Sequence, residues 1–147
     1  MLVVVADQWS KVWIRSYPEG QQIFKFGLFS IVHVHNTGAA FGLFQGYSFA
    51  LTIIALIGIV IILILAFAFS SRLPFLSGWL GKLSLGLILG GTMGNLIDRL
   101  RLGYVTDFID VGFWPAFNVA DSAVTVGVII FAYALLRSLQ SKTGSSA

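Results

Sequence analysis

No Asp, Glu, Lys or Arg occurs between Phe26 and Ser71. Within this uncharged stretch, residues 47–69 are apolar on every face and exceed the roughly 20 residues that a helix needs to cross a bilayer. Hydrophobic residues make up 57% of the chain and charged residues only 10%, whereas about a quarter of a soluble domain is charged. The sequence therefore predicts an integral membrane protein.

The apolar segments predict an all-α membrane protein with a single domain, residues 1–147. Lys82 can extend from the start of one such segment to the membrane interface. We expect four spans, at about 1–17, 47–69, 80–98 and 119–137, and a disordered polar tail over 138–147.

The third span carries Gly86, Gly90 and Gly94 at four-residue spacing. Small residues on one helix face let a neighbouring backbone approach closely. We therefore expect a helix contact along this face.

The first span is short of apolar residues, because only six of them precede Asp7. Asp7 and Lys11 lie one helical turn apart and are expected to form an ion pair. We expect the outer part of a spanning helix here, with an inner part that is short or missing from this sequence. The segment has no basic start and no small-residue cleavage site, so a cleaved signal peptide is not expected.

Residues of about 20–45 differ from the spans in their pattern. Ile31, His33 and His35 alternate with two valines, as in a strand, and the residues from Asn36 to Gly38 predict a turn. We expect a small strand-rich element on the membrane surface. The two histidines suggest no third metal ligand, so no metal site is predicted.

Charge is distributed unevenly over the two ends of the spans. The short 70–82 loop is purely basic, whereas all six acidic residues lie on or towards the other side. We place this loop and both termini in the cytoplasm. The net charge of +3 is too small and too scattered to suggest nucleic acid, and without cysteine the chain has no thiolate chemistry.

Two aspartates, Asp107 and Asp121, stand at the edges of apolar segments. As structural residues, Asp107 would lie in a turn and Asp121 would complete a capping box begun by Asn118. The aromatic segment between them can also dip into the interface and bring the carboxylates together. Two close carboxylates can share a proton and activate water for amide hydrolysis. Asp110, three residues from Asp107, is a competing candidate.

Other polar residues near the outer end of the third span allow two interpretations. Asn95 and Asp98 share a helical face, and Asn95 is a candidate substrate contact. An ion pair between Asp98 and Arg99 would be structural. The small residues that follow Asn36 allow either a tight turn or a close approach to a bound peptide.

Together these motifs resemble the lipoprotein signal peptidase (signal peptidase II) family over nearly the whole chain. The motifs are Asp7-Gln8-x-x-Lys11, Asn36-Thr-Gly-Ala-Ala-Phe41, Gly94-Asn95-x-x-Asp98-Arg99, Val105-x-Asp107-Phe108 and Phe117-Asn118-x-Ala120-Asp121. Five spaced motifs in one order are highly specific, although each alone is weak.

The resemblance implies a bacterial four-helix membrane aspartic peptidase with a small periplasmic β-cradle. Such an enzyme removes the signal peptide from prolipoproteins just before the diacylglyceryl-modified cysteine. The family's first helix has a longer apolar lead-in than this chain. The implied dyad is Asp107 and Asp121, with supporting positions at Asn36, Asn95, Arg99, Asn118, Asp7 and Lys11 and structural positions at Gly94 and Asp98.

The implied partners are prolipoprotein substrates and the lipids of the cytoplasmic (inner) membrane. We expect a monomer without metal or cofactor, and a site near the outer, periplasmic face. The alternative is a non-catalytic membrane scaffold or transporter subunit, in which the acidic residues are buried ion-pair partners. A presenilin-type peptidase is disfavoured, because no Gly-x-Gly-Asp occurs.

Overall fold

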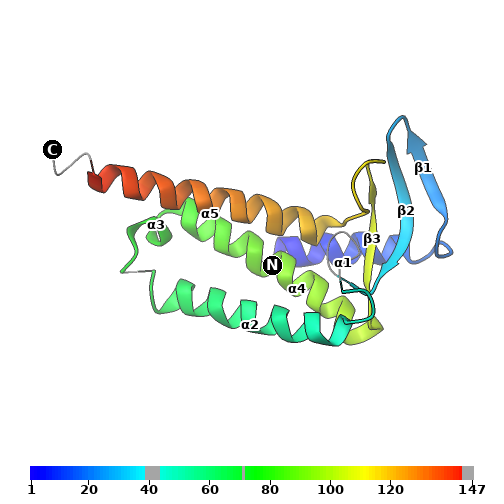
Figure 1. The fold of residues 1–147 in the computed structure, drawn as a ribbon, viewed down its shortest axis with the longest axis horizontal. Helices are drawn as coiled ribbons and strands as arrows, with labels where there is room; N and C mark the ends of the chain where they lie inside the picture. The colour runs from blue at the N-terminus through cyan, green and yellow to red at the C-terminus, as the bar shows by residue number, and fades with distance from the viewer. Residues whose placement is uncertain (39–43, 71, 144–147) are drawn as a thin grey trace.

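The computed structural model describes residues 1–38, 44–70 and 72–143, so Ala39, Ala40 and Phe41 of the small-residue motif and the end of the tail lie outside the described residues. Long helices run side by side, and a small sheet lies at one end of them (Figure 1). The elements are α1 (Leu2–Ile14), β1 (Gln22–Phe26), β2 (Phe29–Asn36), α2 (Ser48–Phe67), α3 (Pro74–Ser77), α4 (Trp79–Leu102), β3 (Val105–Asp110) and α5 (Val119–Thr143).

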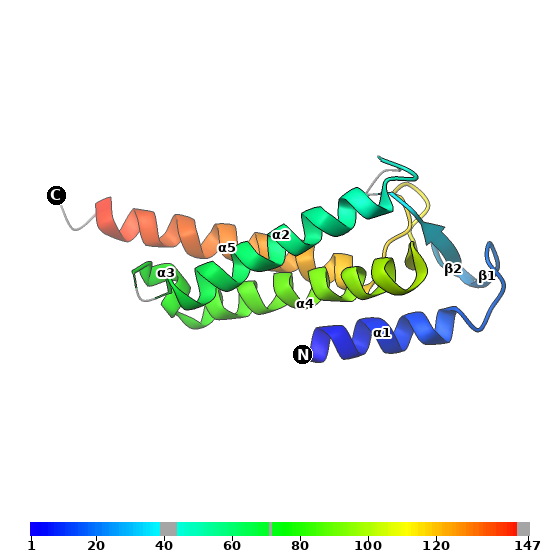
Figure 2. The ribbon, with the colours of Figure 1, turned by 90° about the horizontal axis from the view of Figure 1, so that it is seen from below.

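Three of the described helices are long and apolar enough to cross a membrane: α2, α4 and the part of α5 from Val119 to Gln140. The sequence predicted four. Helix α1 has 13 residues and extends about 20 Å at 1.5 Å per residue, less than the roughly 30 Å of a hydrocarbon core. Its first residue lies beside the middle of the bundle (Figure 2).

Helix α5 is longer than the sequence predicted. It continues to Thr143, past the expected end at Arg137 and into the segment expected to be disordered. The sequence contains no glycine or proline between Arg137 and Thr143 that would end the helix. The remaining residues, 144–147, lie outside the described part.

Helix α4 is central and contacts α1, α2, α3 and α5. Its glycines explain two of these contacts. A Cβ added at Gly90 would lie 2.9 Å from the Val3 Cβ of α1, and one at Gly91 would lie 2.7 Å from a methyl carbon of Val124 on α5. Gly86, however, faces open space, so only Gly90 and Gly94 of the predicted glycine face approach another helix.

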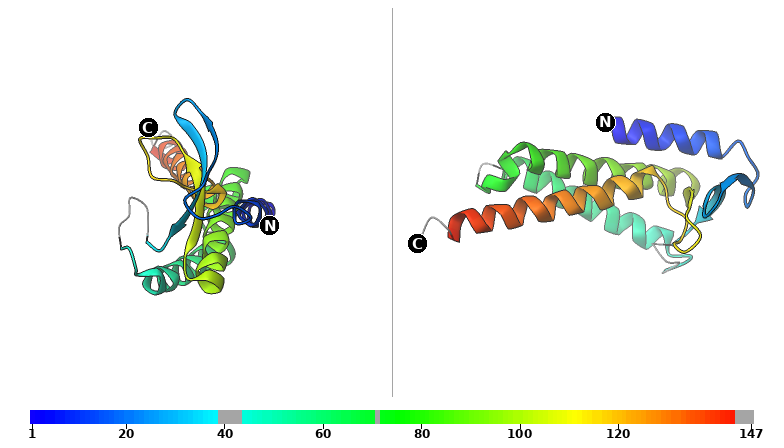
Figure 3. Two further views of the ribbon diagram at one scale, coloured as in Figure 1. Left: turned by 90° about the vertical axis from the view of Figure 1, so that its right-hand side faces the viewer. Right: turned by 90° about the horizontal axis from the view of Figure 1, so that it is seen from above.

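The predicted strand-rich element is part of a three-stranded antiparallel sheet in the order β1-β2-β3. Gly27 connects β1 to β2 with a φ of 61°, a conformation that glycine adopts without a steric penalty. The third strand, β3, was not predicted. Seen from the sheet end, the strands stand across the ends of the helices (Figure 3).

Two turns of the chain position the site. Helix α4 ends at Leu102 and is followed by Gly103, whose φ is 80°, and the chain then enters β3. After β3 the chain returns, so that Phe117 pairs with Ile109: the Phe117 N–H donates to the Ile109 carbonyl at 3.0 Å, and the Ile109 N–H donates back at 2.8 Å. Helix α5 therefore begins beside β3.

Candidate active site

Asp107 lies within β3, opposite Val34 of β2, and not in the turn that a structural role would require. Only 2% of its surface is exposed. Its Oδ1 accepts from Asn118 Nδ2 at 2.7 Å, and its Oδ2 accepts from Asn36 Nδ2 at 2.9 Å. Two amide groups therefore hold this buried carboxyl in place.

Asp121 lies in the first turn of α5 and completes the predicted capping box. Its N–H donates to Asn118 Oδ1 at 2.9 Å, and its Oδ2 accepts from the Asn118 N–H at 3.2 Å. Its Oδ1 accepts from Asn95 Nδ2 at 2.7 Å. Because Asn118 also bonds Asp107, one asparagine connects both aspartates.

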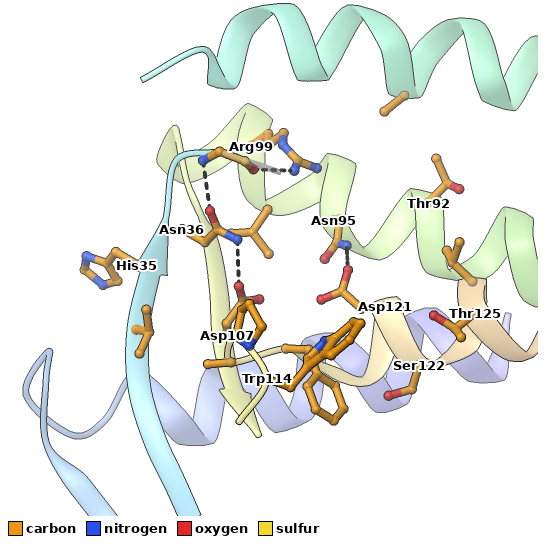
Figure 4. Close-up of a pocket in the computed structure, with 18 of the residues that line it drawn as sticks. His35, Asn36, Thr92, Asn95, Arg99, Asp107, Trp114, Asp121, Ser122 and Thr125 are labelled. Atoms are coloured by element: carbon orange, nitrogen blue, oxygen red, sulfur yellow. Dashed lines mark hydrogen bonds between the residues drawn. The ribbon is translucent and has the colours of Figure 1, made fainter. Parts of the chain in front are cut away.

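The two carboxyl groups border one cavity of about 740 Å³ between the sheet and the helices, and both side chains face it (Figure 4). The size is typical of a ligand site. Besides polar groups, the walls carry apolar side chains from two helices, α2 and α5, and from the 111–116 loop, among them Ala55, Val124, Val126, Trp114 and Pro115.

The environment of Asp107 favours its protonated form. Burial removes water from the carboxyl, and the negative charge of Asp121 adds to this effect, so the pKa of Asp107 rises to about 7. Hydrogen bonds from Asn36 and Asn118 act in the opposite direction but are outweighed. Two carboxyl groups in one cavity, one of them protonated near neutral pH, can share a proton.

Arg99 also borders the cavity, close enough to Asp107 and Asp121 to interact electrostatically with both. Its Nη2 donates to the Gly38 carbonyl at 3.3 Å. Its buried Nε has no hydrogen-bond partner among the described residues.

The expected pairing of Asp98 with Arg99 is wrong. Asp98 instead contacts Arg15 Nη1 at 3.3 Å and Lys11 Nζ at 3.2 Å. Consecutive helical residues point about 100° apart, because a turn takes 3.6 residues, so Asp98 faces α1 while Arg99 faces the cavity. The predicted pair of Asp7 and Lys11 is confirmed, at 2.9 Å.

This ion-pair cluster fixes the helices relative to the sheet. Asp98 Oδ2 accepts from the Thr106 N–H of β3 at 3.0 Å, and Asp7 Oδ1 accepts from the Ala120 N–H of α5 at 2.9 Å. A Cβ added at Gly94 would lie 2.5 Å from Asp7 Oδ2. Asp98 and Gly94 therefore both contact groups that hold α1, β3 and α5 together.

Several residues near the site were not predicted. Gln8 donates to Asp98 Oδ1 at 3.1 Å and to the Gly94 carbonyl at 3.1 Å. Arg15 lies four residues after Lys11, on the same face of α1, and this spacing could have identified it. The cavity residues Thr92, Trp114, Ser122 and Thr125 have no comparable local signal.

Of the competing candidates, Asp110 lies elsewhere, whereas His35 borders the cavity. Asp110 accepts from Ser30 Oγ at 2.9 Å and from the Gly112 N–H at 2.8 Å, and does not line the cavity. His35 stacks on Tyr104 with ring centroids 3.7 Å apart and pairs with Glu19 at 3.1 Å. Burial lowers the pKa of His35.

Together, these features define a membrane protein with long apolar helices, a small sheet and two carboxyl groups on one cavity. The family model of signal peptidase (SPase) II matches residues 1–137. The chain belongs to the signal peptidase II family and is a peptidase of a bacterial membrane.

Individual relatives agree with this assignment. A lipoprotein signal peptidase of Dehalococcoides mccartyi is 54% identical over 127 residues, which cover 86% of this chain and 79% of the relative. One of Moorella thermoacetica is 42% identical over 138 residues, 92% of this chain and 89% of the relative. A bacterial membrane enzyme solved by the in meso method at 2.3 Å resolution has a TM-score of 0.86 and 30% identity, covering 96% of this chain and 87% of its own.

Proposed function

We propose that this chain is an aspartic endopeptidase that removes the signal peptide from diacylglyceryl-modified prolipoproteins, on the N-terminal side of the lipidated cysteine. Cleavage of lipoprotein signal peptides follows from membership of the signal peptidase II family. One observation carries the aspartic mechanism: Asp107 and Asp121 border the same cavity and are both hydrogen-bonded to Asn118.

In the proposed mechanism, Asp107 holds the shared proton and Asp121 is ionised. The pKa of Asp107, about 7, supports this assignment. Asp121 takes a proton from a water molecule between the carboxyl groups, and the water oxygen bonds to the carbonyl carbon that precedes the lipidated cysteine. Asp107 donates its proton to the developing oxyanion.

The second half of the reaction breaks the C–N bond. The proton that Asp121 received passes to the leaving amine, and the hydroxyl proton returns to Asp107 as the carbonyl re-forms. Asn118 and Asn36 keep Asp107 in place, and Asn95 does the same for Asp121. Arg99 lines the same cavity, and its guanidinium group would donate to the substrate backbone.

The proposed membrane placement puts the sheet and the acidic pair at the outer, periplasmic face of the cytoplasmic (inner) membrane, and the end of α5 in the cytoplasm. The basic 70–82 loop supports this orientation; it lies at the end of the bundle away from the sheet (Figure 1). The apolar walls formed by Ala55, Val124 and Val126 would receive the signal helix, and the enzyme would act as a monomer without cofactor.

The alternative, a non-catalytic scaffold or transporter subunit, is not favoured. It would use the acidic residues as ion-pair partners. Asp7 and Asp98 have that role, but no Lys or Arg of the described residues forms an ion pair with Asp107 or Asp121.

The test uses the purified protein in detergent micelles with a lipidated prolipoprotein and its unlipidated form. We expect release of the signal fragment only from the lipidated substrate. Asp107→Asn and Asp121→Asn should remain folded and lose almost all cleavage, whereas the matched control Asp110→Asn, outside the cavity, should keep it. Near-normal cleavage by either cavity variant would refute the dyad.

A further inference from the structure

Lys11 is fully buried, with 0% of its surface exposed. Its ammonium contacts three acceptors: Asp7 Oδ2 at 2.9 Å, Asp98 Oδ2 at 3.2 Å and Asn95 Oδ1 at 2.9 Å. An ammonium group has three N–H donors and no acceptor, so these contacts use every donor. The side chain is therefore held in one position.

This ammonium determines the orientation of the Asn95 amide. Because Lys11 can only donate, Asn95 presents its oxygen to Lys11 and its NH₂ group to the opposite side. That NH₂ group donates to Asp121 Oδ1 at 2.7 Å. Rotating the amide by 180° would place the NH₂ group against the ammonium and the oxygen against the carboxylate, with loss of both bonds.

Two further contacts support the same arrangement. Asn118 Nδ2 donates to Asn95 Oδ1 at 3.1 Å, which again requires the oxygen on that side. Asp7, whose Oδ2 pairs with Lys11, accepts with Oδ1 from the N–H of Ala120, the residue before Asp121. Lys11 is thus connected to Asp121 through a side chain and through the backbone.

We propose that Lys11 is a positioning residue that directs the Asn95 amide to Asp121. The inference depends on the proposed function, because it takes Asp121 as the base of the reaction. The cluster around Lys11 carries no net charge, since Asp7 and Asp98 are balanced by Lys11 and Arg15. The Lys11 ammonium still interacts electrostatically with the Asp107 carboxyl, so the variants that test the proposal remove charges in pairs.

The first test is the double variant Lys11→Met/Asp7→Asn, which removes one charge of each sign, assayed with a lipidated prolipoprotein in detergent micelles. We expect KM within about twofold of wild type and kcat at least about tenfold lower. The acid limb of kcat against pH should move to higher pH, because ionised Asp121 loses a donor. An unchanged kcat and pH profile would overturn the proposal.

The matched control is Arg15→Met/Asp98→Asn, which also removes one charge of each sign but leaves Lys11 beside Asn95. Its kcat should stay within about threefold of wild type. An equal loss in both double variants would show that integrity of the ion-pair cluster, and not the orientation of Asn95, limits the rate. That result would overturn the proposal.

A double-mutant cycle tests the route. In an Asn95→Ala background, Lys11→Met/Asp7→Asn should lower kcat by less than about twofold, because the intermediate group is gone. If the losses in kcat from Asn95→Ala and from Lys11→Met/Asp7→Asn multiply instead, Lys11 does not act through Asn95.

If the buried double variant does not fold, Asn95→Asp replaces it. This variant keeps an oxygen for Lys11 but loses the NH₂ donor, so its kcat should fall at least about tenfold; a wild-type kcat would overturn the proposal. Cleavage by Asp121→Asn would instead refute the proposed function itself.

Discussion

Asn118 and Asp121 bond each other reciprocally at the start of α5, with the Asp121 N–H 2.9 Å from Asn118 Oδ1 and the Asn118 N–H 3.2 Å from Asp121 Oδ2. Such a capping box satisfies two backbone donors of a helix start. Here the same asparagine also donates Nδ2 to Asp107 at 2.7 Å. One residue therefore caps the helix and connects the two carboxyl groups.

Substitutions at Asn118 should separate these two contributions. Serine can cap a helix, so Asn118→Ser should keep most of the stability, whereas Asn118→Ala should lose about 1 kcal/mol of it. Both variants lose the bond to Asp107 and should lose most cleavage. Thermal unfolding and cleavage rates in the same detergent check this. Full activity in Asn118→Ser would show that the bond to Asp107 is dispensable.

The raised pKa of Asp107, about 7, should appear in the pH dependence of cleavage. If Asp107 must be protonated, kcat/KM falls as the pH rises above about 7, and Asp107→Glu should shift this limb. A rate that is constant from pH 6 to pH 9 would contradict the assignment of the proton to Asp107.

The same pKa predicts how stability changes with pH. Between about 3.9, the ordinary pKa of Asp, and about 7, the native state binds more protons at Asp107 than the unfolded state does. The contribution of this group to stability is therefore present at low pH and lost as the pH rises through that window. The unfolding temperature of wild type should therefore fall relative to that of Asp107→Asn between pH 5 and pH 8, because the amide does not titrate.

The 2.9 Å hydrogen bond from Asn36 to Asp107 Oδ2 lowers the pKa of Asp107, and Asn36→Ala removes this bond. Without it the pKa should rise further, and the alkaline limb of the rate profile should move to higher pH. Ser30→Ala is the control on the same strand, because Ser30 bonds Asp110 and not Asp107. Equal shifts in both variants would indicate a general change in the sheet.

Two glycines of α4 should respond oppositely to alanine. At Gly94 the new Cβ would lie 2.5 Å from Asp7 Oδ2 and 3.2 Å from the Ala120 Cβ, so α1 and α5 must move apart. Gly86 faces open space, and alanine there should stabilise the helix by up to about 1 kcal/mol. We expect lower thermal stability and lower cleavage for Gly94→Ala only. Equal behaviour of the two variants would exclude close packing at Gly94.

Local features of the site could be predicted from the sequence because they depend on short spacings. The pair of Asp7 and Lys11 follows from four-residue spacing on a helix, and the capping box follows from the three-residue spacing of Asn118 and Asp121. The family resemblance implied that Asp107 and Asp121 converge. Composition alone did not decide between this arrangement and separate structural roles for the two aspartates.

Other features depend on tertiary contacts and have no local signal. Arg15 bonds Asp98 across 83 positions, so adjacency wrongly suggested Arg99 as the partner. β3 pairs with a strand about 70 residues earlier, and its sequence resembles a polar loop. The length of α1 also could not be decided from the six apolar residues before Asp7.

Asp107 belongs to a strand and Asp121 to a helix, and the chain between them folds back through one isolated pairing of Ile109 with Phe117. Neither element alone contains a hydrolytic centre. A chain whose sheet is not docked on the helices would hold these two acids apart. The cavity that both carboxyl groups border therefore depends on assembly of the strand with the helices.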